Sequence, residues 1–255
     1  MQKRARPPVW LWFNLLSLDA PLIALVWQDF LARCYPTLLR PAGRGALGLT
    51  VWAVYLADRL LDGRHSASAI ETIRQRFYRQ QRGYVVVLLA MVVCTDLLLT
   101  TFSLRPAVLD DGLVLSGCVI AYLATFAFAG WSGVAKKPLA AVLFTSGTFL
   151  IAWTNAGQPL SQLLWPATGF CALCLGNLLM TERWSQHAAP LTRREWIYPA
   201  LLCACLVGGR NSTWFAAIMI SAAALAALAR WGRKISGDAR CILADAVLLT
   251  PLLFR

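Results

Sequence analysis

The stretch that decides the fold is Val51-Trp52-Ala53-Val54-Tyr55-Leu56-Ala57-Asp58-Arg59-Leu60-Leu61-Asp62-Gly63-Arg64. It begins as an apolar run and ends with two aspartates four residues apart. On a helix this spacing places Asp58 and Asp62 on one face, with their Cβ atoms about 5–6 Å apart. Tyr55, three residues before Asp58, lies on the same face. Two carboxylates at the end of an apolar helix need a cationic partner, and the rest of the chain indicates which one.

The composition around this stretch is that of a protein embedded in a membrane. The chain has 255 residues, is 58% hydrophobic and 14% charged, and has a mean hydropathy of +0.59. A soluble domain carries about 25% charged residues, so an ordinary globular core does not account for the deficit. We therefore expect residues 1–255 to form a single membrane domain in contact with lipids.

The net charge of +12 narrows the possible partners. In a soluble protein this charge would suggest nucleic acid, but the sequence contains no basic motif interleaved with aromatic residues. We therefore expect no nucleic acid partner. The positive charge fits better with the bias of cytoplasmic loops toward Lys and Arg, and with attraction to anionic lipid or phosphate groups.

Nine apolar segments are candidates for membrane-spanning helices, because each approaches the roughly 20 residues that a bilayer requires. They cover residues 9–31, 45–62, 83–103, 112–131, 137–155, 162–181, 195–210, 213–230 and 239–254. Short loops join them. The sequence therefore predicts an all-α, polytopic helical bundle with about nine transmembrane helices. The oligomeric state is left open.

The distribution of Lys and Arg predicts how this bundle is oriented. If the N-terminus lies in the cytoplasm, 18 basic residues fall on the cytoplasmic side and 6 on the outer side. Cytoplasmic loops are the ones enriched in Lys and Arg, so we expect an N-in, C-out protein of a bacterial inner membrane. The polar loops near 63–82 and 182–194 then face inward, and any active face should be cytoplasmic.

Asp58 and Asp62 would lie at the C-terminal, cytoplasmic end of the second helix. The negative pole of the helix dipole disfavours carboxylates there, so a positive charge should offset them. Arg59 and Arg64 supply that charge if this is a solvated helix end. Mg²⁺ is the alternative, since it takes oxygen ligands and is usually held by one or two carboxylates plus substrate phosphates.

Two more polar groups fall on the same predicted side. Lys136 and Lys137 precede the fifth helix, where a compact ammonium and the positive helix pole suit a diphosphate. The sixth helix ends with Asn177, Thr181 and Glu182. Glu182 is a fair ligand for Mg²⁺, whereas the neutral Asn and Thr oxygens are weaker. Ordinary positive-inside charge and an ordinary polar helix end are the alternative interpretations.

Three further aspartates, Asp19, Asp96 and Asp245, lie within apolar segments. Intramembrane acids are costly and usually face the bundle interior or a water-filled cavity. Asp19 and Asp245 either line a polar cavity or are protonated and hydrogen-bonded, whereas Asp96 is nearer the outer end and is expected to be structural. Pro21 is expected to kink the first helix. A relay through all three acids would indicate a small proton-coupled transporter.

The acidic end of the second helix resembles the first motif of the UbiA superfamily of intramembrane prenyltransferases. Members of this family have nine helices with the N-terminus inside, and the motif reads N-D-x-x-D-x-x-x-D. Asp58 and Asp62 match its last two aspartates, and Val54-Tyr55 replaces the leading Asn-Asp.

Two other pieces extend the resemblance. The family has a basic pair between its fourth and fifth helices, which Lys136 and Lys137 match. It also has a second acidic motif, typically D-x-x-x-D, at the end of the sixth helix. Asn177, Thr181 and Glu182 stand there in this chain, so Glu182 is the one acid of that motif.

The resemblance implies Mg²⁺-dependent transfer of a prenyl group from a prenyl diphosphate to an aromatic or other lipophilic acceptor. It implies Mg²⁺ on Asp58, Asp62 and Glu182, with Lys136 and Lys137 neutralising the diphosphate. The implied substrate contacts come from Tyr55, Arg64, Asn177, Thr181 and Glu182. Because the second motif is reduced, the alternative is a UbiA-fold protein that binds a polyprenyl or lipid ligand without transferring it.

Overall fold

The computed structural model describes residues 9–65, 73–128, 136–155, 160–186, 212–232 and 235–254, and the regular elements within these ranges are helical. The elements are α1 (Val9–Leu15), α2 (Asp19–Cys34), α3 (Pro41–His65), α4 (Ile73–Gln80), α5 (Arg82–Ser103), α6 (Pro106–Phe128), α7 (Lys136–Asn155), α8 (Leu160–Gln186), α10 (Thr213–Trp231), α11 (Gly237–Val247) and the 3-10 helix η3 (Thr250–Phe254). The all-helical class predicted from the sequence is confirmed for these residues.

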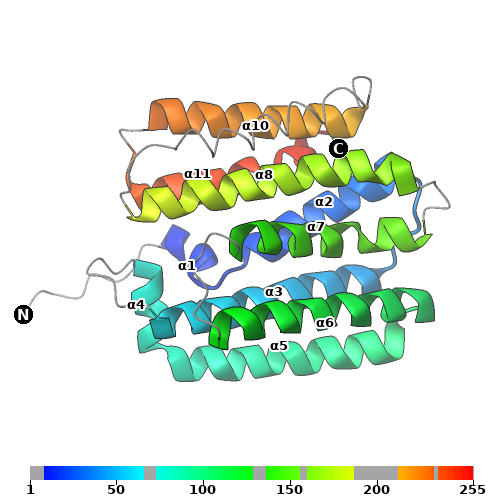
Figure 1. The fold of residues 1–255 in the computed structure, drawn as a ribbon, viewed down its shortest axis with the longest axis horizontal. Helices are drawn as coiled ribbons and strands as arrows, with labels where there is room; N and C mark the ends of the chain where they lie inside the picture. The colour runs from blue at the N-terminus through cyan, green and yellow to red at the C-terminus, as the bar shows by residue number, and fades with distance from the viewer. Residues whose placement is uncertain are drawn as a thin grey trace, which may run out of the picture.

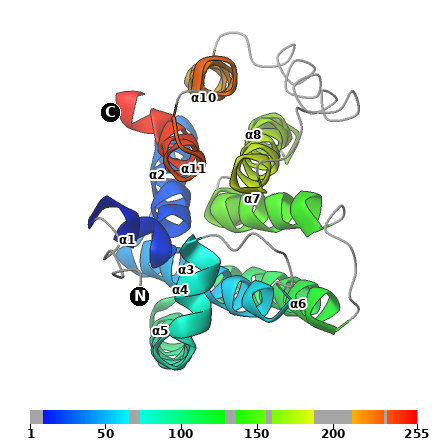
Figure 2. The same cartoon turned by 90° about the vertical axis from the view of Figure 1, so that its left-hand side faces the viewer.

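The long helices lie side by side in one bundle (Figure 1). Helix α2 is central, since it contacts α3, α7, α10, α11 and η3, and Figure 2 shows it between α11 and α3 when the bundle is viewed from its end. Helices α5 and α6 lie on the side of α3 away from α8 and α10. Helix α2 therefore organises the interior.

The core is built from large side chains of the inner helices. Trp27 of α2, Phe149 of α7 and Phe170 of α8 are fully buried. The ring of Phe170 lies 4.4 Å from that of Trp27 and 6.0 Å from that of Phe149, measured between centroids. Trp27 Nε1 also donates a 2.8 Å hydrogen bond to the carbonyl of Leu248, at the end of α11. This satisfies a buried donor and joins α2 to the C-terminal part of the chain.

Within the described part of the chain, four helical segments are long and apolar enough to cross a membrane: Arg82–Ser103, Pro106–Ala127, Ser161–Ser185 and Thr213–Trp231. Only 11% of the apolar window is buried in α5 and in α6, and Val87, Leu97 and Phe102 of α5 are exposed. Apolar surface of this extent is suited to contact with lipid. These features indicate an integral membrane protein.

The first predicted span, 9–31, is not one helix. It divides into α1 and α2 at Leu16–Leu18, where Ser17 adopts a positive φ of 53°. The Ser17 hydroxyl hydrogen-bonds to the Tyr78 hydroxyl of α4 at 2.8 Å. Pro21 lies in the first turn of α2, where its missing N–H costs little. The expected kink at Pro21 was therefore wrong, because the chain breaks before Asp19 instead.

Other predicted boundaries also shift. Helix α3 continues to His65, and part of the expected loop 63–82 is the helix α4. The predicted span 239–254 consists of α11, with 11 residues, followed by η3. Neither piece is long enough to cross a bilayer alone. The predicted span 195–210 lies outside the described residues.

Candidate functional site

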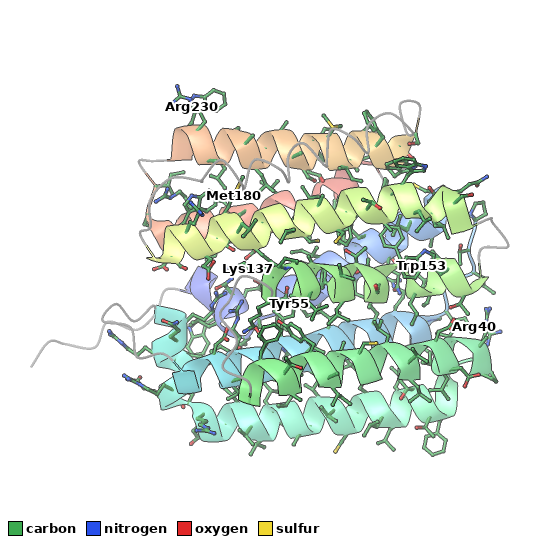
Figure 3. All side chains as sticks on the ribbon, in the orientation of Figure 1. Arg40, Tyr55, Lys137, Trp153, Met180 and Arg230 are labelled. Carbon is green, nitrogen blue, oxygen red and sulfur yellow. The ribbon has the colours of Figure 1, made fainter. Side chains whose placement is uncertain are left out.

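Several of the residues singled out in the sequence meet at one end of the bundle. Helix α3 ends there, α7 begins there and α8 ends there. Figure 3 places Lys137 and Met180 toward this end, and Arg40 and Trp153 toward the other. The alternation of long apolar helices and short connections produces this arrangement, since every second connection returns to the same end.

Lys136 lies between the two aspartates of α3. Its Nζ is 2.9 Å from Asp58 Oδ1 and donates to Asp62 Oδ1 at 2.5 Å, while Arg59 Nη1 is 3.5 Å from Asp62 Oδ2. Burial alone would lower the pKa of Lys136, but the carboxylates of Asp58 and Asp62 outweigh it and raise the pKa above its usual value. The two acids thus share one cation. Their spacing predicted a common face and a positive partner, but not that Lys136 is that partner.

Lys137 takes a different direction and forms an ion pair with Glu182 of α8. Successive residues on a helix point about 100° apart, so neighbouring lysines reach two different helices. We call Asp58, Asp62, Lys136, Lys137 and Glu182 the paired rim. Each of the three acids in it contacts a lysine, and Asp58 and Asp62 share the single charge of Lys136.

A pocket of about 630 Å³, including open space at its mouth, lies inside the bundle. Its lining comes from α2, α3, α4, α7, α8 and α11. Apolar side chains such as Ile23, Phe144 and Leu178 form part of the wall. The polar residues of the lining are Asp19, Tyr55, Arg59, Arg74, Asn177, Thr181 and Asp245. We call this the central pocket.

The predicted site residues divide between the central pocket and the paired rim. Tyr55, Asn177 and Thr181 line the pocket. The five residues of the rim are not part of the lining, but Arg59 contacts both, since it lines the pocket and pairs with Asp62. Arg64 belongs to the last turn of α3, and its side chain lies outside the described part of the structure.

The residues partly fit the predicted Mg²⁺ site. Asp58 and Asp62 direct oxygens at one ammonium group, so two carboxylates already converge on the position of a cation. Mg²⁺ needs only one or two carboxylates when substrate phosphates complete its shell. In the described ranges, no three His, Cys, Asp or Glu side chains are close enough together to hold a metal ion. Glu182 therefore does not join the two aspartates in one cluster.

Sequence reasoning missed two pocket residues, Arg59 and Arg74. Arg59 follows Asp58 directly and so faces another side of α3, while Arg74 comes from α4. The charge of Arg59, together with burial, lowers the pKa of Arg74. Arg59 Nε is buried with no hydrogen-bond partner among the described residues. Both guanidinium groups line the pocket, where Asp62 partly offsets the charge of Arg59 and Asp19 and Asp245 partly offset that of Arg74.

Asp19 and Asp245 also line the central pocket, as one interpretation of these intramembrane acids predicted. Asp96 is placed elsewhere: it accepts a 2.6 Å hydrogen bond from Thr50 and lines neither of the pockets that contain the other two. The three acids therefore do not form one set.

No family model, no curated protein and no solved structure matches this chain. The assignment of a function consequently rests on the chemistry of the paired rim and the central pocket.

Proposed function

We propose that the protein is an intramembrane prenyltransferase of the UbiA type. It would transfer a prenyl group from a prenyl diphosphate to an aromatic or other lipophilic acceptor. The observation that carries the proposal is the meeting of the α3 acids, the α7 lysines and the end of α8 next to a pocket with a partly apolar wall. A prenyl diphosphate has the same division, with a polyanionic head and an apolar chain.

The charged residues suit the departure of a diphosphate. Arg59 and Arg74 line the central pocket, and Lys136 and Lys137 lie in the rim beside Arg59. Fixed positive charge at the position where negative charge develops usually makes the largest single contribution to catalysis. Mg²⁺ held by Asp58 and Asp62 would supply further charge stabilisation of the leaving oxygen.

The apolar wall suits the prenyl chain. Tyr55 and Phe144 make an edge-to-face contact with ring centroids 6.3 Å apart, and both line the central pocket. Aromatic faces attract positive charge, so they would favour the positive charge that develops on the prenyl carbon as the diphosphate leaves. The same wall keeps water away from that carbon.

The finer topology is part of this proposal. We propose nine transmembrane segments, of which α11 and η3 together form the last, an N-in, C-out orientation in a bacterial inner membrane, and a cytoplasmic paired rim. One observation supports the orientation. Lys137 and Arg230 lie toward the same end of the bundle, and the positive-inside rule favours an end with basic residues as the cytoplasmic one.

One observation favours the second candidate, a UbiA-fold protein that binds a polyprenyl or lipid ligand without transfer. Every acid of the paired rim has a lysine partner, and Arg59 adds a third positive charge beside Asp62, so the charges of the site balance without a metal. The transporter alternative has less support, because Asp96 bonds to Thr50 and is separate from the pocket acids.

Calorimetric titration with geranyl diphosphate separates the first two candidates. A transferase should bind this probe at least about tenfold more tightly with Mg²⁺ than without it, which corresponds to about 1.4 kcal/mol. Asp58→Ala and Asp62→Ala should remove that gain. Asp110→Ala, which changes an exposed acid at the start of α6, should leave it intact. The transferase proposal would be overturned if the affinity for geranyl diphosphate changed neither with Mg²⁺ nor in the Asp58→Ala and Asp62→Ala variants.

A further inference from the structure

Asp19 and Asp245 form a pair whose hydrogen bonds join four helices. Asn14 Nδ2 of α1 donates to Asp19 Oδ2 at 3.0 Å and to Asp245 Oδ2 at 3.5 Å. Asp19 opens α2, and Asp245 lies in α11. Asn177 Nδ2 of α8 donates to the other oxygen of Asp245 at 2.9 Å. Two amides thus fix the positions of two carboxylates that are remote in sequence.

Asn177 provides a separate indication that a ligand belongs here. Its side chain is only 6% exposed and lines the central pocket, and its Oδ1 has no hydrogen-bond partner in the described part of the chain. A buried polar oxygen of this kind is costly unless a donor reaches it. The missing group is therefore a hydrogen-bond donor, such as a hydroxyl.

The carboxylate pair is also accessible from a second pocket. This pocket, of about 470 Å³ including open space, lies between α1, α2 and α11 and contains Asp19 and Asp245. The rest of its lining is mainly apolar, including Phe13, Leu22 and Ile242. The two acids therefore stand where a mostly apolar pocket meets the polar central one. A molecule with an apolar body and a donating head fits that junction.

The central pocket holds both signs of charge. The cations, Arg59 and Arg74, come from α3 and α4, and the carboxylates of α2 and α11 lie close enough to Arg74 to interact with it electrostatically. An anionic head is favoured near the guanidinium groups and repelled by the carboxylates. A neutral donor such as a phenol has the opposite preference. The other titratable groups in the lining are Tyr55, Cys174 and Cys241.

The pair also supplies an acid that the resemblance led us to expect elsewhere. Asn177 stands in the region of the reduced second acidic motif, and Asp245 is bonded directly to it. Helix α11 thus places a carboxylate beside a position where α8 carries a neutral amide.

We propose that Asp19 and Asp245 bind the hydroxyl group of a phenol-like lipophilic acceptor and accept its proton. The binding step stands by itself, and the chemical step rests on the proposed transferase function. In that step the hydroxyl proton passes to a carboxylate oxygen, and the electron pair of the O–H bond delocalises into the ring. A ring carbon then bonds to the prenyl carbon, whose bond to the diphosphate oxygen breaks with its electron pair leaving on the diphosphate. The hydrogen on that ring carbon leaves as a proton to the second carboxylate, its C–H electron pair restores the aromatic ring, and the first carboxyl group returns its proton to the oxygen.

The test compares two probes, para-pentylphenol and para-pentylanisole, which differ in the donating hydrogen. Binding to the full-length protein in lipid nanodiscs is measured without Mg²⁺ or diphosphate and corrected for partitioning into empty nanodiscs. Wild type should bind the phenol about tenfold more tightly, since hydrogen bonds to charged groups are the stronger class. Asp19→Asn and Asp245→Asn should lose this preference, and Asp96→Asn, which alters an acid outside the pocket, should keep it.

Thermal unfolding identifies any variant that fails to fold, and the wild-type comparison does not depend on the variants. Equal binding of the two probes by wild type would overturn the proposal, and so would a preference that persists in both folded Asp→Asn variants. Asp58→Ala should leave the phenol preference unchanged. If Mg²⁺ does not increase the affinity for geranyl diphosphate but wild type still prefers the phenol, the transferase proposal is wrong. The role of Asp19 and Asp245 in binding a hydroxyl group is then still supported.

Discussion

Lys136 and Asp62 are 74 residues apart in the sequence, yet their Nζ and Oδ1 atoms lie 2.5 Å from each other. This contact joins the beginning of α7 to the end of α3. It places the ammonium where a metal ion held by Asp58 and Asp62 would also have to lie. The lysine and a divalent cation therefore compete for the same carboxylates.

Replacing Lys136 should expose that competition. We expect Lys136→Met to raise the affinity for Mg²⁺ alone by about tenfold, because two carboxylates are left without their shared partner. The loss of partly exposed ion pairs should reduce stability by only about 0.5–1 kcal/mol. Titration with Mg²⁺ measures the first effect and thermal unfolding the second. Lys137→Met, which releases Glu182 instead, is the matched control, and equal Mg²⁺ affinity in all three proteins would contradict the prediction.

The same lysine should make stability depend on pH in alkaline solution. Its pKa is raised in the folded protein, so the folded state holds its proton more tightly than the unfolded state does. This stabilisation is fully present below the unfolded pKa, near 10.4, and is lost as pH rises through the higher folded pKa. We expect the melting temperature of wild type to fall more steeply than that of Lys136→Met above about pH 10.4. Parallel curves for the two proteins would refute this.

The aromatic core should tolerate little change. Phe170 is fully buried between Trp27 and Phe149, so Phe170→Ala should leave a cavity and cost about 3–5 kcal/mol. Phe102→Ala on α5 removes the same atoms from a side chain that is 81% exposed, and it should change the melting temperature little. Similar losses for both variants would mean that α5 is covered by another surface.

Gly237 should be required for the close approach of α11 to α8. A Cβ atom at this position would lie 2.7 Å from the carbonyl oxygen of Trp184, whereas one at Gly176 would meet nothing within 4 Å. Gly237→Ala should therefore move the start of α11, lower the melting temperature and weaken the phenol preference assigned to Asp245. Gly176→Ala should be neutral or stabilising by up to about 1 kcal/mol, because alanine favours helix. An unchanged Gly237→Ala protein would contradict the close contact.

The sequence alone predicted that the residues of the paired rim lie at the same end of the bundle. Alternating apolar segments and the distribution of Lys and Arg assign Asp58, Lys136, Lys137 and Glu182 to the same end, and the structure brings the four together in ion pairs. To place these residues at one end, only the order of the long helices along the chain is needed, and hydropathy identifies those helices well. The detailed course of the loops has no influence on it.

Two features depend on contacts between distant parts of the chain. Pro21 is a local sign that a helix starts nearby, but the break at Ser17 is accompanied by a hydroxyl contact with Tyr78, 61 residues later. Arg74 belongs to a short, strongly basic segment that has the composition of a loop. Its segment is helical in the structure, and the neighbouring Tyr78 is buried in a cluster with Leu56 and Val85. Long-range packing, rather than propensity, places both residues.

The two lysines that open α7 are consecutive, yet one is paired with acids of α3 and the other with the acid of α8. A single helical turn therefore cross-links α3 to α8 through α7. An anion that attracts either lysine would weaken the ion pair that this lysine makes, and so the contact of α7 with α3 or with α8.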